Sequence, residues 1–230
     1  MIPVFGNPCD PRSNRYICNF AENKHMKVAI FGSSGRTGIL TVYQALDKGY
    51  FVTAFSRKAT RVTIRHPKIT VIEGDIMDYD RVKQAISGNE AVIIALGTGV
   101  NKPTRVLSDG TANIIRAMKE CGVPRVICMS SAGILGTDTS RLFRWIYIPL
   151  LLRHIFRDKI RQMDLIRESG LEWVIVRPPS LTLAPKTGTY QITSGRPATT
   201  SVPRADVADF MLKLLTLKTY DRQLPAISGF

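Results

Sequence analysis

The sequence lacks any long hydrophobic run, and it contains few cysteines and histidines. No uninterrupted apolar segment approaches the roughly 20 residues needed to span a bilayer, and residues 1–25 have no apolar centre of the kind found in signal peptides. The three histidines and four cysteines show no metal-ligand spacing, so we expect no metal site. Cys121 and Cys128 lie where free thiols usually act as small buried hydrophobic groups. These absences predict a cytoplasmic protein in a reducing compartment.

Acidic residues are also scarce. The chain has 18 aspartates and glutamates against 32 lysines and arginines, which gives a formal net charge of +14. Such a charge suits anionic small molecules, nucleic acid or membrane surfaces. The basic residues are scattered and no aromatic-rich RNA-binding motif is present, so nucleic acid and membranes are not the favoured partners. We expect a small-molecule partner and a monomer or homodimer.

One segment combines basic and apolar residues. Between residues 141 and 161 it contains Trp145, Tyr147 and three consecutive leucines among six lysines and arginines. We expect a lid or a partner-facing helix beside the substrate site, with Trp145 either contacting substrate or lying in the core. The alternative is an interfacial membrane helix.

The size of the chain suits a single domain. A length of 230 residues and a hydrophobic content of 44% are enough for one α/β domain with a full core. Residues 1–25 hold prolines and asparagines without periodicity, which predicts an extension outside the fold or padding at its edge. Residues 26–230 are expected to form the domain, with small substrate-side elements near the C-terminus.

Apolar strands and amphipathic helices alternate along the chain. The expected strands are 27–31, 51–55, 69–73, 91–95, 125–129 and 172–176, and the expected helices are 37–48, 78–86, 108–121, 159–168 and 204–217. This alternation predicts a Rossmann-type, doubly wound parallel sheet with right-handed crossovers. In such a sheet, ligands bind beyond the carboxyl ends of the strands.

The first expected strand runs into glycines spaced GxxGxxG. The first glycine allows a tight turn, the second lets a pyrophosphate approach the backbone, and the third lets the next helix pack on the strand. The positive end of that helix then faces the phosphates. The residues expected to bind the cofactor here are Gly32, Ser34, Gly35, Arg36, Thr37 and Gly38. A glycine-rich turn without a ligand is the alternative.

The end of the second strand indicates which dinucleotide is bound. An NAD-binding protein usually carries an acidic residue there, whereas this chain has Arg57 and Lys58, with Arg61 one helical turn later. A guanidinium group binds a phosphate bidentately, so these cations favour the 2′-phosphate of NADP. A solvated basic loop is the alternative.

The remaining strand ends supply further candidates. Asp75 is expected to accept a hydrogen bond from the adenine amino group, or else to cap a turn, and Ile76 to pack on the adenine face. Gly97 either lets the chain pass close to the cofactor or is a turn glycine. The other candidates for cofactor binding are Leu96, Thr98, Ser130, Ser131, Pro178 and Ser180.

These motifs resemble a known family. AIFGSSGRTG (29–38), TAFSRKATR (53–61), EGDIMD (73–78), ALGTG (95–99) and RESGLEWVIVRPP (167–179) are similar to atypical short-chain dehydrogenase/reductases of the NmrA-like, NAD(P)H-binding group. Within this group the chain is most similar to the biliverdin-IXβ reductase/flavin reductase type. The resemblance implies that Arg57 and Arg61 hold the 2′-phosphate, Asp75 and Ile76 the adenine, and that Ser131 faces the nicotinamide.

The chain departs from this superfamily at its usual acid–base pair, Tyr-x-x-x-Lys. Lys159 occupies the lysine position, but Ile155 stands where the tyrosine should be and cannot transfer a proton. One interpretation is an NADPH-dependent reductase of a flavin, a biliverdin-like tetrapyrrole or a quinone, in which Ser131 orients the nicotinamide and Lys159 holds its ribose. The other is a non-catalytic NADP(H) sensor or scaffold, including an RNA-associated form. Tyr147 is expected to serve packing only.

Overall fold

The computed structural model describes residues 25–97, 104–135 and 152–230. The predictions for Thr98, Trp145 and Tyr147 lie outside the described residues, as do most of the N-terminal extension and the larger part of the basic and apolar segment. No helix in the described part of the chain is long and apolar enough to cross a membrane.

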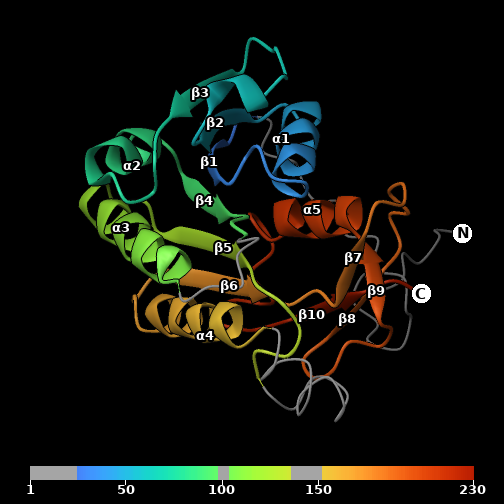
Figure 1. Cartoon of the computed structure of the whole chain (residues 1–230). Coiled ribbons are helices and arrows are strands. Elements are labelled where there is room, and N and C mark those ends of the chain that lie inside the picture. The colour runs from blue at the N-terminus through green and yellow to red at the C-terminus, as the bar shows by residue number, and fades with distance from the viewer. Residues whose placement is uncertain (1–24, 98–103, 136–151) are drawn as a thin grey trace, which may run out of the picture.

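Six parallel strands form the central sheet in the order β3-β2-β1-β4-β5-β6 (Figure 1). Their bounds are β1 Lys27–Phe31, β2 Phe51–Ser56, β3 Ile69–Glu73, β4 Ala91–Ile94, β5 Arg125–Met129 and β6 Glu172–Val176. The chain starts in the middle of the sheet, builds outward to β3, and then crosses back to build outward to β6. This reversal between β1 and β4 confirms the predicted doubly wound sheet. In sheets of this kind, ligands bind at the carboxyl ends of the two strands between which the strand order reverses.

Helices cover both faces of the sheet. Their bounds are α1 Gly38–Asp47, α2 Tyr79–Ile86, α3 Val106–Glu120, α4 Arg153–Arg167 and α5 Arg204–Lys213, with a 3₁₀ turn η1 at Ala59–Arg61. Alternate side chains of β1 show the two cores. Val28 and Ile30 join the core under α1 and α5, whereas Ala29 and Phe31 join the core under α2, α3 and α4 (Figure 1). Because both faces are covered, the central strands are apolar throughout.

Four short strands lie at the C-terminal side of the sheet. They are β7 Ser180–Thr182, β8 Gln191–Thr193, β9 Ser201–Pro203 and β10 Ala226–Ser228. β7 pairs with β9 in parallel, and β8 pairs with β10 antiparallel. The segment leading into β10 also runs beside β6, through bridges of Val174 with Gln223 and of Arg177 with Ala226. The sequence predicted only small elements near the C-terminus and not these strands, because three-residue strands carry almost no periodicity.

Two helix boundaries differ from prediction by more than two residues. α4 begins at Arg153 rather than Lys159, because Phe156 packs into the core and so extends the apolar face by a turn. α5 ends at Lys213 rather than at 217. Beyond it the hydrogen bonds tighten, and the N–H of Leu215 donates to the carbonyl of Leu212.

Candidate functional site

The glycine turn between β1 and α1 needs small residues at all three positions. Gly32 has a φ of 81°, and a Cβ there would lie 2.6 Å from the carbonyl oxygen of Ala95. A Cβ on Gly38 would lie 2.0 Å from the carbonyl oxygen of Gly32, and one on Gly35 would lie 3.1 Å from the same oxygen. The N–H of Gly35 donates to that oxygen at 2.9 Å. α1 therefore begins in direct contact with the end of β1, as a bound pyrophosphate requires.

The start of α1 presents unpaired backbone donors. Among the described residues, the N–H groups of Arg36, Thr37 and Gly38 have no acceptor. The side chain of Thr37 does not cap the helix, and its Oγ1 accepts a hydrogen bond of 3.3 Å from Nη1 of Arg204. Free N–H groups at the positive end of a helix are a common phosphate-binding arrangement. The predicted phosphate-binding residues are thus brought together at this point.

Hydrogen bonds join the glycine turn to the end of β2. The hydroxyl of Ser56 donates to that of Ser34 at 2.8 Å, and the hydroxyl of Ser33 donates to the carbonyl of Phe55, also at 2.8 Å. Oγ of Ser56 accepts the N–H of Lys58 at 3.3 Å. The two loops that the sequence assigns to the phosphates of the cofactor are therefore held side by side.

The three cations after β2 are exposed. Arg57 and Lys58 follow the strand directly, and Arg61 closes η1. The carboxylate of Glu73 accepts the N–H of Ala59 at 2.7 Å and so fixes the start of η1. In the described part of the chain, none of the three cations has an ion-pair partner. Their charges are available to an anionic ligand beside the glycine turn.

The loop after β3 gives a mixed result for the adenine site. Oδ1 of Asp75 accepts the N–H of Met77 at 2.9 Å, which is the turn-capping role. Ile76 is only 6% exposed and packs against α3, where a Cβ on Gly110 would lie 2.3 Å from its Cδ1. Ile76 is therefore a core residue that packs against α3. The contacts of Asp75 and Ile76 with adenine stay predictions.

The end of β4 lies against the glycine turn. A Cβ on Gly32 would meet the carbonyl oxygen of Ala95 and, at 3.1 Å, the backbone nitrogen of Leu96. Leu96 is half-buried and Gly97 is exposed, and no atom of the described residues lies within 4 Å of a Cβ built on Gly97. Packing therefore does not require glycine at position 97, although the position adjoins the predicted cofactor site.

The ends of β5 and β6 are joined by the backbone. The N–H of Ala132 donates to the carbonyl of Pro178 at 2.8 Å. Ser130 is buried, and its hydroxyl has no hydrogen-bond partner among the residues that the structure describes, so it is a polar group that a ligand can satisfy. Ser131 is half-buried and donates to the carbonyl of Ala132 at 3.1 Å, while Ser180 is exposed at the start of β7.

Lys159 lies in α4 with the half-buried Ile155 one turn before it. Burial lowers the pKa of Lys159, whereas the neighbouring Cys128 and Asp158 act to raise it. Cys128 is the penultimate residue of β5, so the ammonium group lies towards the carboxyl end of the sheet. Burial raises the pKa of Cys128 to about 12. No proton-donating side chain stands at position 155.

Asp158 is a buried carboxylate that the sequence analysis missed. It accepts the N–H of Leu107 at 2.9 Å, the N–H of Ser108 at 3.1 Å and the hydroxyl of Ser108 at 2.6 Å. The N-cap residue of α3, Arg105, provides no side-chain cap, so the carboxylate from α4 replaces it. These bonds hold the helix that carries Lys159 against α3. The signal in the sequence was an aspartate on the helix face that also carries Phe156 and Ile166.

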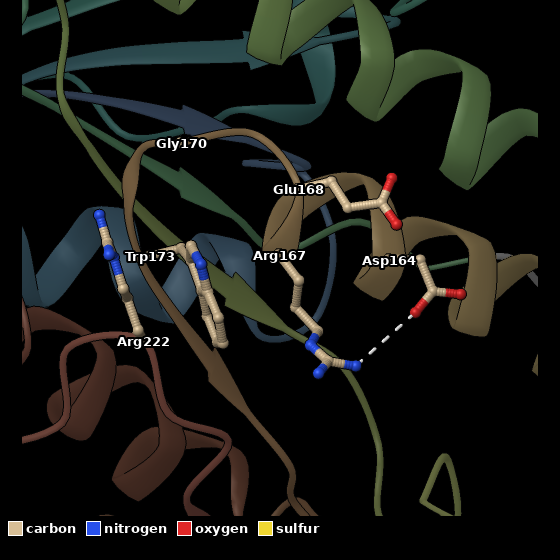
Figure 2. A pocket seen from close by; sticks show the side chains of 6 residues that line it. All are labelled: Asp164, Arg167, Glu168, Gly170, Trp173 and Arg222. Carbon is tan, nitrogen blue, oxygen red and sulfur yellow. Dashed lines mark ion pairs between the residues drawn. The ribbon is translucent and has the colours of Figure 1, made fainter.

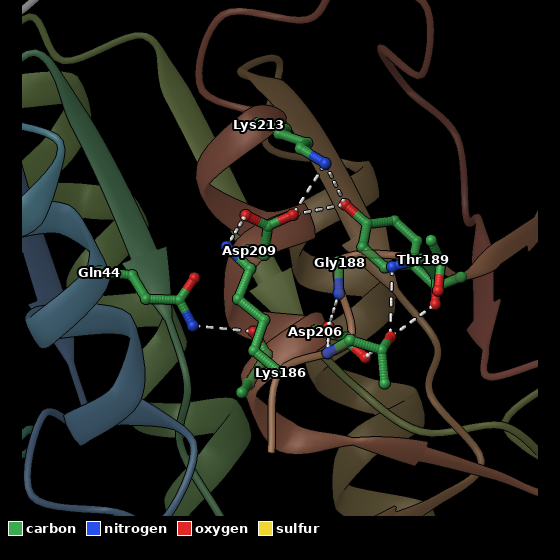
Figure 3. Close-up of polar contacts among 10 residues, drawn as sticks. Gln44, Lys186, Gly188, Thr189, Asp206, Asp209 and Lys213 are labelled. Carbon is green, nitrogen blue, oxygen red and sulfur yellow. Dashed lines mark hydrogen bonds and ion pairs between the residues drawn. The ribbon is translucent and has the colours of Figure 1, made fainter. Parts of the chain in front are cut away.

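A second carboxylate that the sequence analysis missed, Asp206, fixes the loop before β8 to α5. It is fully buried and accepts the N–H groups of Thr187 and Gly188, each at 2.9 Å (Figure 3). The hydroxyl of Thr187 adds a third bond of 2.6 Å. A single residue of α5, Asp206, thus holds the loop before β8.

Asp209, one turn later in α5, holds the same loop through charges. It forms ion pairs with Lys186 at 2.6 Å and Lys213 at 2.8 Å, and it accepts the hydroxyl of Tyr190 at 2.9 Å (Figure 3). Burial acts to raise the pKa of Asp209, but the hydrogen bonds from these three partners outweigh it and lower that pKa. Burial and the adjacent Asp209 raise the pKa of Tyr190. Two aspartates three residues apart in an apolar helix were the signal for this cluster.

A surface hollow of about 520 Å³ lies away from these residues (Figure 2). It adjoins Trp173, the second residue of β6, and is thus at the amino end of the strands. Its lining residues are Asp164, Arg167, Glu168, Gly170, Trp173 and Arg222. Because ligands of this fold bind at the carboxyl ends, the hollow is not part of the predicted cofactor site.

Comparison with known proteins identifies the family. A sequence model of the NAD(P)H-binding family matches residues 32–218, which is most of the chain. The chain belongs to the NAD(P)H-binding family. The match begins at the first glycine of the turn and runs past α5, so it includes the glycine turn, the ends of β2 to β6 and the helices described above.

An individual relative matches a large part of the chain. The chain is 28% identical over 180 residues to the uncharacterized chloroplastic protein At2g34460 of Arabidopsis thaliana, and this match covers 73% of the chain and 64% of that protein. The chain thus spans less than two thirds of this relative's length.

Solved structures share the fold. A short-chain dehydrogenase/reductase from Veillonella parvula, in complex with NADP, superposes with a TM-score of 0.76 at 23% identity, covering 89% of this chain and 94% of that one. A suggested NADH-flavin reductase from Streptococcus pneumoniae has a TM-score of 0.74 at 22% identity, covering 89% and 100%. These similarities confirm the predicted Rossmann-type fold.

Proposed function

We propose that the protein is an NADPH-dependent reductase that transfers hydride to a conjugated acceptor, such as a flavin, a biliverdin-like tetrapyrrole or a quinone. The observation that carries this proposal is the combination of a phosphate-binding glycine turn with unpaired cations beside it and an apolar residue in place of the catalytic tyrosine. The names of structural neighbours, an NADP-bound dehydrogenase/reductase and a suggested flavin reductase, support the same direction.

The residues around the glycine turn fit a dinucleotide with a 2′-phosphate. Glycines allow backbone contact with the pyrophosphate, and the N–H groups of Arg36, Thr37 and Gly38 have no other acceptor among the described residues. Arg57 and Arg61 follow β2 and form no ion pair with the described residues. The hydrogen bond between Ser56 and Ser34 holds this segment beside the glycine turn. These features support NADPH over NADH as the preferred cofactor.

The choice of acceptor follows from the absence of a proton donor. The cofactor supplies the hydride when bound. Ile155 cannot protonate a developing alkoxide, and we assign Lys159 to the nicotinamide ribose and Ser131 to the nicotinamide itself. A conjugated acceptor spreads the incoming charge over its ring system and takes its proton from solvent, so it needs no tyrosine. A simple ketone does need such help.

The cofactor assignment is tested by Arg57→Ala. Losing a charge-assisted bond to the 2′-phosphate should weaken NADPH binding about 10- to 100-fold, because such bonds contribute roughly 1.5–3 kcal/mol. NADH, which lacks this phosphate, should lose little affinity. Dissociation constants from cofactor fluorescence provide the measurement, and Arg65→Ala, an exposed arginine in the following loop, is the matched control. Equal losses for both cofactors would remove Arg57 from the 2′-phosphate site.

The reaction is tested by following NADPH oxidation with FMN, biliverdin, menadione and a simple ketone. We expect turnover with at least one conjugated acceptor and none with the ketone. Tight NADPH binding without turnover on any acceptor would instead favour the non-catalytic sensor, which the isoleucine at position 155 also suits.

A further inference from the structure

Arg204, the first residue of α5, reaches the phosphate end of the predicted cofactor site from the far end of the sequence. Its Nη1 donates to Oγ1 of Thr37 at 3.3 Å, across a separation of 167 residues. Its Nε is buried and has no hydrogen-bond partner in the described part of the chain. α5 packs beside α1, where Gln44 donates to the carbonyl of Ala205 at 2.9 Å, so the position of Arg204 is fixed by the helix pair.

The charge of Arg204 is not balanced by the protein. In the described part of the chain, neither Arg204 nor the nearby Arg36 forms an ion pair. Burial, and then the positive charge of Arg36, lower the pKa of Arg204. By contrast, the buried Arg125 is paired with Glu172 at 3.2 Å and with Asp221 at 2.9 Å. Two unpaired guanidinium groups beside a helix N-terminus are unfavourable until an anion joins them.

We propose that Arg204 completes the pyrophosphate site of the cofactor. Its guanidinium group and Arg36 face the phosphates bound at the start of α1, and its bond to Thr37 positions the threonine hydroxyl. Because Oγ1 of Thr37 accepts from Arg204, the hydroxyl hydrogen of Thr37 is left to donate to a phosphate oxygen. This inference rests on the dinucleotide site proposed above and adds a residue to it from the C-terminal part of the chain.

The pyrophosphate, rather than the 2′-phosphate, is the group that this arrangement addresses. Thr37 and Arg204 meet at the N-terminus of α1, whereas Arg57 and Arg61 follow β2. Both NADPH and NADH carry the pyrophosphate. The role of Arg204 therefore predicts a loss of affinity that the two cofactors share, in contrast to the loss expected for Arg57→Ala.

The test is the variant Arg204→Met, which keeps the length of the side chain and removes its charge and donors. We expect the dissociation constants of NADPH and NADH to rise by a similar factor, about 10- to 100-fold. Arg204→Lys, which keeps the charge, should recover part of the loss. Arg65→Met is the matched control and should bind both cofactors as the unchanged protein does.

Two further measurements separate this role from a structural one. Without cofactor, Arg204→Met should melt at or above the temperature of the unchanged protein, because a like-charge repulsion has been removed. The double variant Thr37→Val/Arg204→Met should lose less binding free energy for the cofactor than the two single variants lose together, because both residues act on one phosphate contact. If Arg204→Met does not fold, the dissociation constants of both cofactors are measured for Arg204→Lys and Thr37→Val instead.

The outcomes are distinct. If the unchanged protein binds neither cofactor, the dinucleotide site itself is wrong. If it binds both while Arg204→Met binds them equally well, or if only NADPH binding is weakened, the assignment of Arg204 to the pyrophosphate is overturned.

Discussion

Replacing Gly38 by alanine tests how closely α1 approaches the end of β1. The added Cβ would lie 2.0 Å from the carbonyl oxygen of Gly32 and 2.8 Å from its carbonyl carbon, and both are backbone atoms that cannot rotate away. Overpacking usually costs 1–3 kcal/mol, and contact with backbone places this case near the upper end, at about 3 kcal/mol. Alanine returns about 1 kcal/mol through its higher helix propensity. The clash is the larger effect, so we expect a net loss of about 2 kcal/mol.

The assay is thermal unfolding of the protein without cofactor. A loss of about 2 kcal/mol lowers the melting temperature by about 4 to 8 °C in a domain of this size. Gly35→Ala, with its nearest contact at 3.1 Å, should lose less stability. Gly97→Ala, whose Cβ would have no atom of the described residues within 4 Å, should change stability by under about 0.5 kcal/mol. A melting temperature for Gly38→Ala at or above that of the unchanged protein would refute the close packing of the turn.

Two other predictions concern titratable groups. The lowered pKa of Asp209 means that its ion pairs stabilise the protein above the ordinary aspartate pKa of about 3.9 and that this stabilisation is lost as the pH falls through the lowered value. In urea unfolding between pH 7 and pH 3, the stability difference between the unchanged protein and Asp209→Asn should therefore shrink below about pH 4; a constant difference would contradict it. Because burial raises the pKa of Cys128 to about 12, alkylation at pH 8 followed by peptide mapping should modify the half-buried Cys121 first, and equal labelling would show that Cys128 is not enclosed.

The sheet and its phosphate-binding turn could be predicted from sequence because their signals are local. Lys27–Phe31 is apolar along its whole length apart from its first residue, and the three glycines follow it at fixed spacing. The exposed cations after β2 were found in the same way, by counting from the end of a strand. Each of these signals depends on neighbours in the chain, and the structure places them at one edge of the sheet.

The carboxylates and Arg204 could not be predicted because their partners lie far away in the sequence. Asp158 caps a helix that begins about 50 residues earlier, and Arg204 contacts a threonine 167 residues before it. An aspartate in an apolar helix signals that a partner exists without saying which one. The burial of Ile76 was not predicted either, since the sequence placed it beside a strand end without showing that α3 would cover it; its contact with adenine stays a prediction.

The serine pair that joins the glycine turn to β2 has a consequence for the energetics of ligand capture. Ser34 and Ser56 hold two loops together through a bond of 2.8 Å between protein groups alone, and Ser33 adds a second bond to the same strand. A binding surface that is already ordered loses little conformational entropy when it meets its ligand. Because this surface is preorganised, more of the free energy of the phosphate contacts contributes to the affinity for the ligand.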